Sequence, residues 1–501
     1  MKKFLLPLLF VIVGVAVQAK PIDPMTQAVL NAYEKLLQED PGDYTTLYER
    51  AMQYYQLEMY PQALDDVDHA LRITPDDKKE LKAKEYELRG SILAMGKNYK
   101  DAVAAIRKAL ECQPGDYELN YRLGEFSLLA GDNEGARGAF AAMQRKQSRS
   151  PEAMLGLARV DVAQGKFQDA MTKMKQAEEL NSSLWTTYQG IGDMLVQLGQ
   201  PQQAALNYVR AIALADGQAM PLESLFRLSS ANYPAVKAGL EEAQKKANNS
   251  VAMPLLMGNV AFQTGHYADA SQALNQVLTR EQGRQPGVYS LLAECLLAQG
   301  RAAEGVDYAN RAVKISPNAH NLAILARTLR GAGNYTEALD AAQKALKASA
   351  TDADALTEEA FAYIGLKDYD KALASLQKLI AADPDNIYAL VLAGSVQDKL
   401  KNSATPSVYY SRALSAPART PAEVALKGLA QLKTGKTLDG DATLRKLIEN
   451  PAPEACYWAA VAYVNSGDSA RGAALARQAR DLGYQNAYLL DVASGPITLR
   501  P

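Results

Sequence analysis

Apolar residues between positions 353 and 384 recur at spacings of three and four. The first set is Leu356, Ala360, Tyr363 and Ile364, and the second set is Ala372, Leu376, Leu379 and Ile380. This spacing places the apolar side chains of each set on one helix face, so it predicts two amphipathic helices joined by a short turn. Helices of this length are marginal on their own in water. Each therefore needs a neighbour that covers its apolar face.

The same pattern recurs with a period of about 34 residues, which supplies that neighbour. The matching positions in residues 286–317 are Tyr289, Ala293, Leu296, Gly300, Gly305, Ala309, Ala312 and Pro317. Earlier in the chain they are Gly90, Tyr99, Ala102, Ile106, Ala109 and Pro114, and before them Ala51, Tyr60, Ala63, Val67, Ala70 and Pro75. A small residue in the first helix, Gly and then an aromatic residue at the turn, two Ala in the second helix and a closing Pro resemble the tetratricopeptide repeat. The resemblance implies an all-α fold, a right-handed superhelical α-solenoid of about twelve to thirteen hairpins with an N-terminal half-repeat cap.

Each position of the pattern has a mechanical role. Small residues in both helices let them approach closely, where a larger side chain would overpack at a cost of about 1–3 kcal/mol. Gly after the first helix allows a left-handed C-cap, and Pro ends the second helix. The residues assigned to these structural roles include Gly90, Ala102, Ala109, Pro114, Gly300, Pro317, Ala360, Ala372 and Pro384.

The repeats predict the organisation of the chain. The expected parts are a signal peptide (1–19), an N-terminal capping half-repeat (20–43), a first repeat block (44–217), a degenerate repeat or hinge (218–250), a second repeat block (251–482), and a C-terminal cap and tail (483–501). Residues 218–250 lose the Gly and the first-helix pattern, and Pro221 and Pro234 interrupt them. A break between two blocks is therefore expected there.

The first nineteen residues have the three parts of a secretory signal peptide. Lys2 and Lys3 precede an apolar stretch over 4–17, and Val17 and Ala19 form a small-residue cleavage site. The alternative is a membrane anchor, but the stretch is shorter than the roughly 20 residues that span a bilayer. Cleavage after Ala19 and export are expected, to a periplasmic or extracellular location, with no transmembrane segment in the mature chain.

Charge and cysteine content argue against nucleic-acid binding and against a disulfide framework. The net charge is −2, and no basic run appears along the sequence, which disfavours nucleic acid as a partner. The three cysteines lie in distant repeats, too far apart for a disulfide in a solenoid, so isolated thiols are expected.

The chain lacks an evident catalytic constellation. The three histidines, His69, His266 and His320, lie in separate repeats and read as surface or turn residues. Carboxylate pairs such as Glu358-Glu359 are expected on solvated helix faces. We therefore expect no enzyme activity, no metal and no cofactor.

The resemblance implies a binding surface on the concave side, which the first helices line. The candidate residues are Tyr48, Met52, Tyr55, Tyr121, Glu125, Leu128, Arg159, Asp193, Asn259, Phe262, Glu294, Arg327, Arg330 and Phe361. This mixed and fairly apolar set suits a docked peptide segment with aromatic anchors. The sequence thus predicts a protein-binding scaffold of the bacterial envelope with an unidentified partner. The alternative is a glycan-binding protein that uses exposed tyrosines and Trp185.

Overall fold

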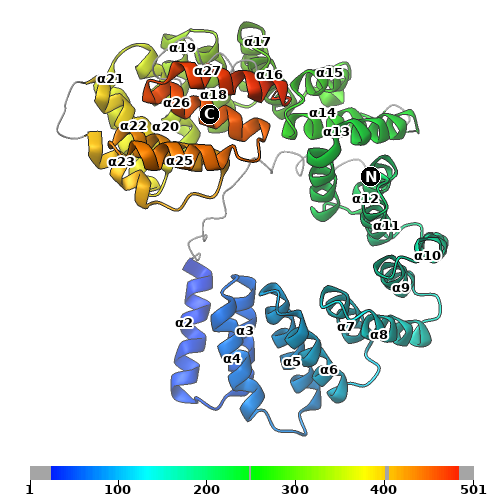
Figure 1. The fold of residues 1–501 in the computed structure, drawn as a ribbon. Helices are drawn as coiled ribbons and strands as arrows, with labels where there is room; N and C mark the ends of the chain where they lie inside the picture. Colours follow the sequence, from blue (N-terminus) through cyan, green and yellow to red (C-terminus); the bar gives the residue numbers. More distant parts are fainter. Residues whose placement is uncertain (1–23, 247–249, 401–405, 485–501) are drawn as a thin grey trace. The chain divides into compact units, whose positions relative to one another are not determined.

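The structure, a computed structural model, describes residues 24–246, 250–400 and 406–484. These residues form helices and no strand, so the predicted all-α fold is confirmed (Figure 1). The chain divides into two compact units, unit 1 up to Ala243 and unit 2 from Gln244. The predicted signal peptide and residues 485–501 of the predicted tail lie outside the described residues.

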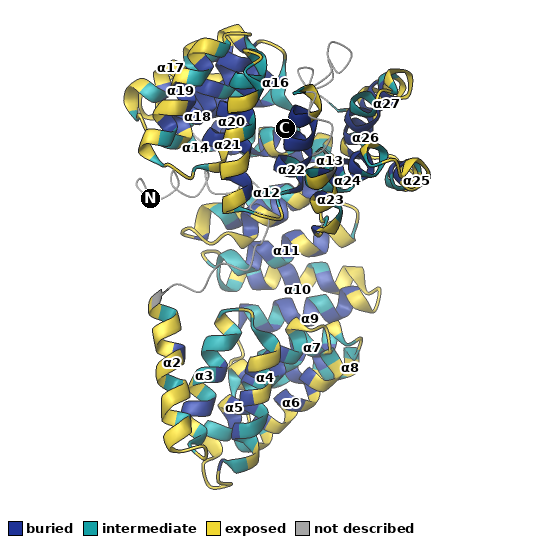
Figure 2. Cartoon of the chain, turned by 90° about the vertical axis from the view of Figure 1, so that its left-hand side faces the viewer, coloured by how far each residue is buried: buried dark blue, intermediate teal, exposed yellow. Residues whose placement is uncertain are grey.

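Unit 1 begins with a single helix and continues as hairpins. Its helices are α2 (Pro24–Glu39), α3 (Tyr44–Gln56), α4 (Tyr60–Ile73), α5 (Lys79–Met95), α6 (Tyr99–Cys112), α7 (Tyr117–Leu129), α8 (Asn133–Lys146), α9 (Pro151–Ala163), α10 (Phe167–Leu180), α11 (Trp185–Gln197), α12 (Pro201–Leu214) and α13 (Met220–Lys246), whose last residues belong to unit 2. The lone helix α2 packs against α3. Most of its surface is exposed, as the yellow colour of α2 in Figure 2 shows.

Unit 2 repeats the hairpin plan. Its helices are α14 (Ala252–Gln263), α15 (Tyr267–Leu278), the 3₁₀ turn η1 (Glu281–Gly283), α16 (Pro286–Ala298), α17 (Ala302–Ile315), α18 (Ala319–Gly331), α19 (Tyr335–Ala348), α20 (Ala353–Gly365), α21 (Tyr369–Ala382), α22 (Ile387–Lys399), α23 (Pro406–Ser415), α24 (Pro421–Lys433), α25 (Thr437–Leu447), α26 (Pro453–Ser466) and α27 (Ser469–Asp481).

Within each hairpin the first helix packs on the second. First helices are α3, α5, α7, α9 and α11 in unit 1 and the even-numbered helices α14 to α26 in unit 2. First helices also pack on the first helices of adjacent hairpins, as α18 does on both α16 and α20. Each unit is therefore an α-solenoid with a layer of first helices and a layer of second helices.

The closing prolines keep the hairpins in step with the sequence period. Pro75, Pro114, Pro317 and Pro384 each lie two residues beyond the last residue of a second helix. The residue between helix end and Pro leaves the helical region, as Asp383 does with φ −136° and ψ 90°. A residue before Pro is disfavoured in α conformation, so each Pro fixes where the chain turns to the next hairpin.

A left-handed residue follows the first helix of each regular hairpin. It is a glycine in Gly131, Gly165, Gly199, Gly265, Gly300, Gly333, Gly435 and Gly467. At the same place Glu58, Lys97 and Lys367 have φ values of 59°, 60° and 62°. A side chain makes this conformation unfavourable, so these three turns carry strain that glycine avoids.

Replacing Lys367 by Gly should raise the free energy of unfolding by about 0.5–1 kcal/mol, because glycine adopts the left-handed turn without a Cβ clash. Urea titration followed by circular dichroism measures the change. The control is Lys378→Gly, at an exposed position inside helix α21, where glycine should cost about 1 kcal/mol. Destabilisation of equal size in both variants would contradict the prediction.

Side-chain volume is matched between the two helices of a hairpin. A Cβ added at Gly124 of α7 would lie 2.5 Å from the Phe140 ring of α8, so the aromatic ring occupies space that only glycine leaves open. At the equivalent positions of α18 and α19, Ala326 packs with the small Ala342. A large side chain on one helix is therefore matched by a glycine on the other, or both residues are small, so that the two helices stay closely packed.

Within the segment 218–250, helix α13 (Met220–Lys246) bends at Asn232 (φ −154°, ψ 70°). Asn232 Oδ1 accepts a hydrogen bond of 3.3 Å from the Ala235 backbone N–H and so caps the second half of the helix. Pro221 lies in the first turn, where proline is tolerated, and Pro234 follows the bend. The boundary between the two units lies in the same helix.

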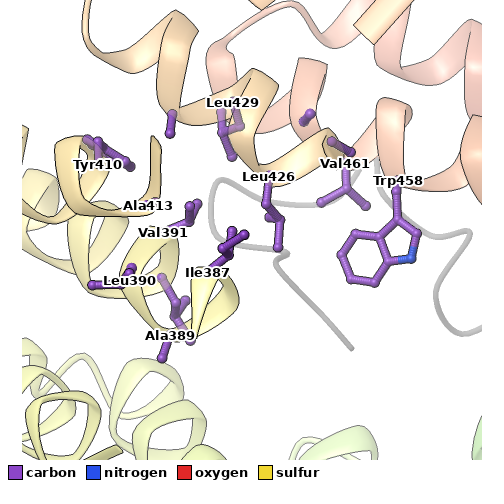
Figure 3. Packing of buried hydrophobic residues seen from close by; sticks show 14 of the residues in the cluster. Ile387, Ala389, Leu390, Val391, Tyr410, Ala413, Leu426, Leu429, Trp458 and Val461 are labelled. Carbon is purple, nitrogen blue, oxygen red and sulfur yellow. The ribbon is translucent and has the colours of Figure 1, made fainter. Parts of the chain in front are cut away.

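The largest hydrophobic core lies in the second half of unit 2. Figure 3 shows Ile387 and Leu390 of α22 near Tyr410 of α23 and Leu426 of α24, all buried in one cluster. Helix α22 is covered on most of its circumference, since its buried residues do not follow a single stripe. The first helix α22 is thus buried among its neighbouring helices.

Candidate interaction surface on the first helices

Every candidate binding residue lies on a first helix, but the residues differ in burial. Half-buried are Tyr48, Met52, Tyr55, Tyr121, Glu125, Leu128, Arg159, Phe262, Glu294 and Arg327; buried are Asn259, Arg330 and Phe361; Asp193 is exposed. In each unit, the first-helix surface on which these residues lie is therefore partly covered by the protein itself.

In unit 2, Arg327 of α18 is the centre of an ionic cluster that joins three successive first helices. Its guanidinium group donates hydrogen bonds to Glu294 of α16 (3.0 Å), Glu358 of α20 (2.9 Å) and Asp354 of α20 (3.0 Å). Arg330, one turn further on, donates to the second oxygen of Glu358 at 2.7 Å. Glu358 thus accepts from two arginines while its side chain is 0% exposed.

Burial and charge act in opposite directions on the two inner carboxyl groups. Burial would raise the pKa of Glu358, but Arg330 and Arg327 outweigh it and hold that pKa below its usual range. Burial also raises the pKa of Glu294, and there Arg327 and His320 offset only part of the effect. Glu358 is therefore the carboxylate on which the ionised cluster depends.

The sequence-based expectation that Glu358-Glu359 marks a solvated face is wrong. Glu358 is enclosed by the two arginines, and Glu359 is buried and accepts a 2.7 Å hydrogen bond from the Ser375 hydroxyl of α21. Glu358 faces the previous first helix, α18, and Glu359 faces the second helix of its own hairpin, α21, so both carboxylates are covered.

Aromatic rings continue the cluster along the first helices. The Arg330 guanidinium lies 4.6 Å from the Phe361 ring centroid, within cation–π distance. The Phe361 ring is 6.4 Å from the Tyr388 ring of α22, and burial raises the pKa of Tyr388 well above its ordinary value. Polar and aromatic groups of four successive hairpins are therefore linked.

Unit 1 has simpler ion pairs between successive first helices. Arg122 of α7 contacts Glu87 of α5 at 2.7 Å, and Arg159 of α9 pairs with Glu125 of α7. Burial, together with Glu125, raises the pKa of Tyr121 to about 12. Charged candidate residues in unit 1, as in unit 2, therefore bind one another across the repeat interface.

Two further polar candidates also have partners inside the chain. Asp193 accepts hydrogen bonds from Gln189 (3.1 Å) and from the Tyr208 hydroxyl (2.8 Å). The Asn259 amide donates to the Leu255 carbonyl of its own helix at 2.9 Å. These contacts stabilise the hairpins, whatever else the residues bind.

The N-terminal candidates are different, because they offer apolar and aromatic surface. Tyr48, Met52 and Tyr55 of α3 are half-buried beside a small core, and the Tyr55 and Tyr60 rings are 6.0 Å apart. Burial raises the pKa of Tyr48, and the negative charge of Glu87 on α5 adds to this effect. This part of the first-helix layer presents large side chains with remaining open area.

Two exposed apolar residues were missed in the sequence. Met95 and Leu129, the last residues of first helices α5 and α7, are each 53% exposed. Their recurrence after one repeat period was the available signal. They extend the apolar surface of unit 1 to the turn end of the first helices.

The glycan alternative assumed exposed aromatic rings. Every tyrosine in the described ranges is buried or half-buried, and Trp185 is half-buried.

The three cysteines are free thiols, and none of the described residues forms a cluster of His, Cys, Asp or Glu suited to a metal ion. No helix in the described ranges has both the length and the apolar character that crossing a bilayer requires.

The fold and this surface define a class, the α-solenoids built from stacked helical hairpins. A family model described as tetratricopeptide repeat matches residues 91–153, 128–185 and 255–320, and a second one matches residues 329–393. The matched parts of the chain thus consist of tetratricopeptide repeats. Such repeats form scaffolds for protein–protein interaction and are typically not catalytic.

One similar protein of known name is cellulose synthase operon protein C of Pseudomonas fluorescens (strain SBW25). It is 25% identical over 409 residues, which are 74% of this chain and 31% of that protein. The chain therefore spans less than a third of the length of this relative.

Two similar solved structures differ in size. YrrB, titled a TPR protein with an unusual peptide-binding site, is 18% identical, with 39% of this chain and 98% of that chain covered and a TM-score of 0.28. The Cut9-Hcn1 hetero-tetramer of the APC/C is 12% identical, with 92% and 91% covered and a TM-score of 0.33.

Proposed function

We propose that this protein is a non-enzymatic adaptor that binds a segment of a partner protein along its first helices, with the main anchor in unit 1. The half-buried surface of Tyr48, Met52 and Tyr55 on α3 carries the proposal. Large aromatic and Met side chains with open area are typical anchors of peptide interfaces. They hold no ion pair that a ligand must first break.

The charged candidates have a second role in this proposal. Glu125 with Arg159, and Glu294 with Arg327, fix the register of successive repeats. The exposed edge of the Glu125–Arg159 pair in unit 1 orients the partner, while the partner's apolar side chains bind at the N-terminal hairpins of the same unit. Met95 and Leu129 extend that apolar path along α5 and α7.

An envelope location is part of the proposal. It is supported by the signal-peptide pattern of residues 1–19 and by the similarity to a protein of a bacterial cellulose synthase operon. The same similarity favours glycan capture as a second candidate, with Trp185 and tyrosines stacking on sugar rings. The apolar side chains of Met52, Met95 and Leu129 on the same helices make a protein segment the first choice.

Selection of a displayed random-peptide library on the immobilised protein, beside a glycan array, tests the choice. We expect selected peptides to bind the Tyr48→Ala/Met52→Ala variant at least tenfold more weakly, a loss of about 1.4 kcal/mol or more. The control, Gln62→Ala/Asp65→Ala, changes exposed positions of α4 and should bind as the parent does. Retention of polysaccharides with no peptide selected, or equal loss in both variants, would contradict the proposal.

N-terminal sequencing of the protein recovered from its producing cell tests the export step. A mature chain beginning at Lys20 supports it, and an intact Met1 in the cell fraction contradicts it.

A further inference from the structure

The second helices of unit 2 carry a basic side chain at one recurring position. These residues are Arg311 of α17, Lys344 of α19, Lys378 of α21, Arg412 of α23 and Lys446 of α25, one repeat apart. All five are exposed. They are about 34 residues apart in the linear sequence, which is why no basic column is visible there.

More basic residues surround this column. In the C-terminal halves of the second helices from α17 to α27, the exposed basic residues, which we name the basic ridge, are Arg311, Lys314, Lys344, Lys347, Lys378, Arg412, Arg445, Lys446, Arg477 and Arg480. Asp481 is the only carboxylate in those helix halves, all of which the structure describes. The ridge therefore carries a strong local excess of positive charge on a chain whose net charge is −2.

Most of the ridge is not neutralised by the protein. Lys344 pairs with Asp340 at 2.6 Å and Arg445 with Asp441 at 2.7 Å. The other eight form no ion pair with a described residue, although the Arg311 guanidinium lies over the Tyr308 ring. Their charges are thus available to a partner.

Basic residues near a helix C-terminus interact favourably with the helix dipole, and this effect alone could explain their positions. It does not explain why carboxylates are missing beside them, because in unit 1 basic residues at the same helix ends have carboxylates nearby. In the same halves of its second helices, Lys108 pairs with Glu111 at 2.7 Å, and Arg210 pairs with Glu178 at 3.1 Å. These halves in unit 1 hold Asp68, Glu111, Glu178 and Glu179 beside their basic residues, so the excess of positive charge is larger in unit 2.

The ridge follows a line. Helices α17, α19, α21, α23 and α25 succeed one another around the edge of unit 2 (Figure 1). Since first helices of adjacent hairpins pack at about 8–10 Å, the basic positions of their second helices follow at a spacing on the order of 10 Å. An extended polymer chain fits a line of charges better than a flat surface such as a membrane does.

We propose that the basic ridge binds an acidic segment of a partner protein that lies across successive second helices of unit 2. The exposed amides Asn310, Gln343 and Gln377 flank the column; Gln343 and Gln377 each donate one hydrogen bond to a tyrosine hydroxyl and keep a second N–H for peptide groups or carboxylates of the partner. Only Ile315 is a strongly exposed large apolar residue within these helix halves, so the surface lacks the apolar face with which helices lie in a lipid interface. This surface is separate from the first-helix candidates, so either site can fail without the other.

Binding of labelled poly-L-glutamate of about 20 residues to the full chain at low salt tests this site. We expect the Lys378→Glu/Arg412→Glu/Lys446→Glu variant to bind at least tenfold more weakly than the parent, and parent binding to weaken as salt is added. The control is Lys108→Glu/Lys175→Glu/Arg210→Glu, with the same charge change on exposed second-helix positions of unit 1, and it should stay within about twofold of the parent.

Three results would overturn the proposal. They are no binding by the parent, an equal loss in the control variant, or ridge-dependent binding of phosphatidylglycerol vesicles or dextran sulfate without binding of poly-glutamate. Circular dichroism checks that each variant is folded. If the glutamate variant is not, the corresponding Gln variant replaces it, and unchanged affinity in that folded variant also overturns the proposal.

Discussion

Replacing Glu358 by Gln is expected to lower the free energy of unfolding of unit 2 by about 3–5 kcal/mol. The substitution keeps the shape of the side chain but removes the charge that Arg330 and Arg327 share at 2.7 and 2.9 Å. Arg330, itself buried, would then lack its carboxylate. Removing one partner of a buried ion pair costs more than the pair contributes, because the remaining charge stays desolvated. Urea titration of the full chain, followed by circular dichroism, measures the effect.

Asp354→Asn is the matched control for this prediction. Asp354 contacts the same Arg327 at 3.0 Å, but its side chain is 61% exposed. Exposed ion pairs contribute roughly 0–1 kcal/mol, so the control should lose no more than that. An equal loss of unfolding free energy in the two variants would contradict the prediction, because it would mean that the burial of Glu358 does not set its contribution to stability.

The pH dependence of the Glu358 effect has a defined sign. Burial raises the pKa of Glu358, but the two arginines dominate and the folded-state pKa lies below the unfolded value. The stabilisation is therefore present above the unfolded pKa of about 4.3 and is lost as the pH falls through the folded pKa. The difference in unfolding free energy between parent and Glu358→Gln should be full at pH 7 and should shrink below about pH 4. A constant difference across this range would contradict the assigned charge.

Ala372→Asp is expected to cost several kcal/mol, about 3–5, and to abolish the cooperative unfolding of its neighbourhood. Ala372 of α21 has no exposed surface and shares a core cluster with Ala360 of α20. At the equivalent crossing of α5 and α6, a Cβ added to Gly90 would lie 3.3 Å from the Ala102 carbonyl oxygen, so the two helices leave no space there. A carboxylate at this site has neither room nor a cation, and its desolvation is uncompensated.

The control for Ala372→Asp is Ala374→Asp in the same helix. Ala374 is exposed, so the same chemical change should alter stability by no more than about 0.5 kcal/mol. Thermal melting followed by circular dichroism compares both variants with the parent. If Ala372→Asp melts with the parent, the assignment of the repeat positions is wrong.

The hairpins were predictable because their determinants are local. The spacing of Leu356 and Ala360 defines a helix face, and Pro384 defines where the next helix must stop. The turn residue was less secure, since Lys367 adopts the left-handed conformation that glycine takes in most other repeats. The turn there is imposed by the packing of α20 on α21 rather than by the residue's own preference.

The role of charged residues was less predictable. Glu125 and Arg159 were predicted as ligand contacts, which stays a prediction, and the structure also pairs them with each other across one repeat, which the sequence did not indicate. Glu358 was expected on a solvated face and is enclosed. The basic ridge was not predicted either, because its members occur singly or in pairs about one repeat apart and only the stacking of the hairpins brings them together.

By itself, the sequence determined that this protein consists of helical hairpins repeated in a fixed register, because helix period, turn glycines and closing prolines act within a few residues. Only the tertiary structure decided which side chains of successive hairpins meet. Residues one repeat apart are brought into contact by stacking, and the energy of a charge depends on whether that contact supplies a counter-charge and excludes water. The same residue types therefore form a buried ionic cluster on the first helices and an open basic ridge on the second helices of unit 2.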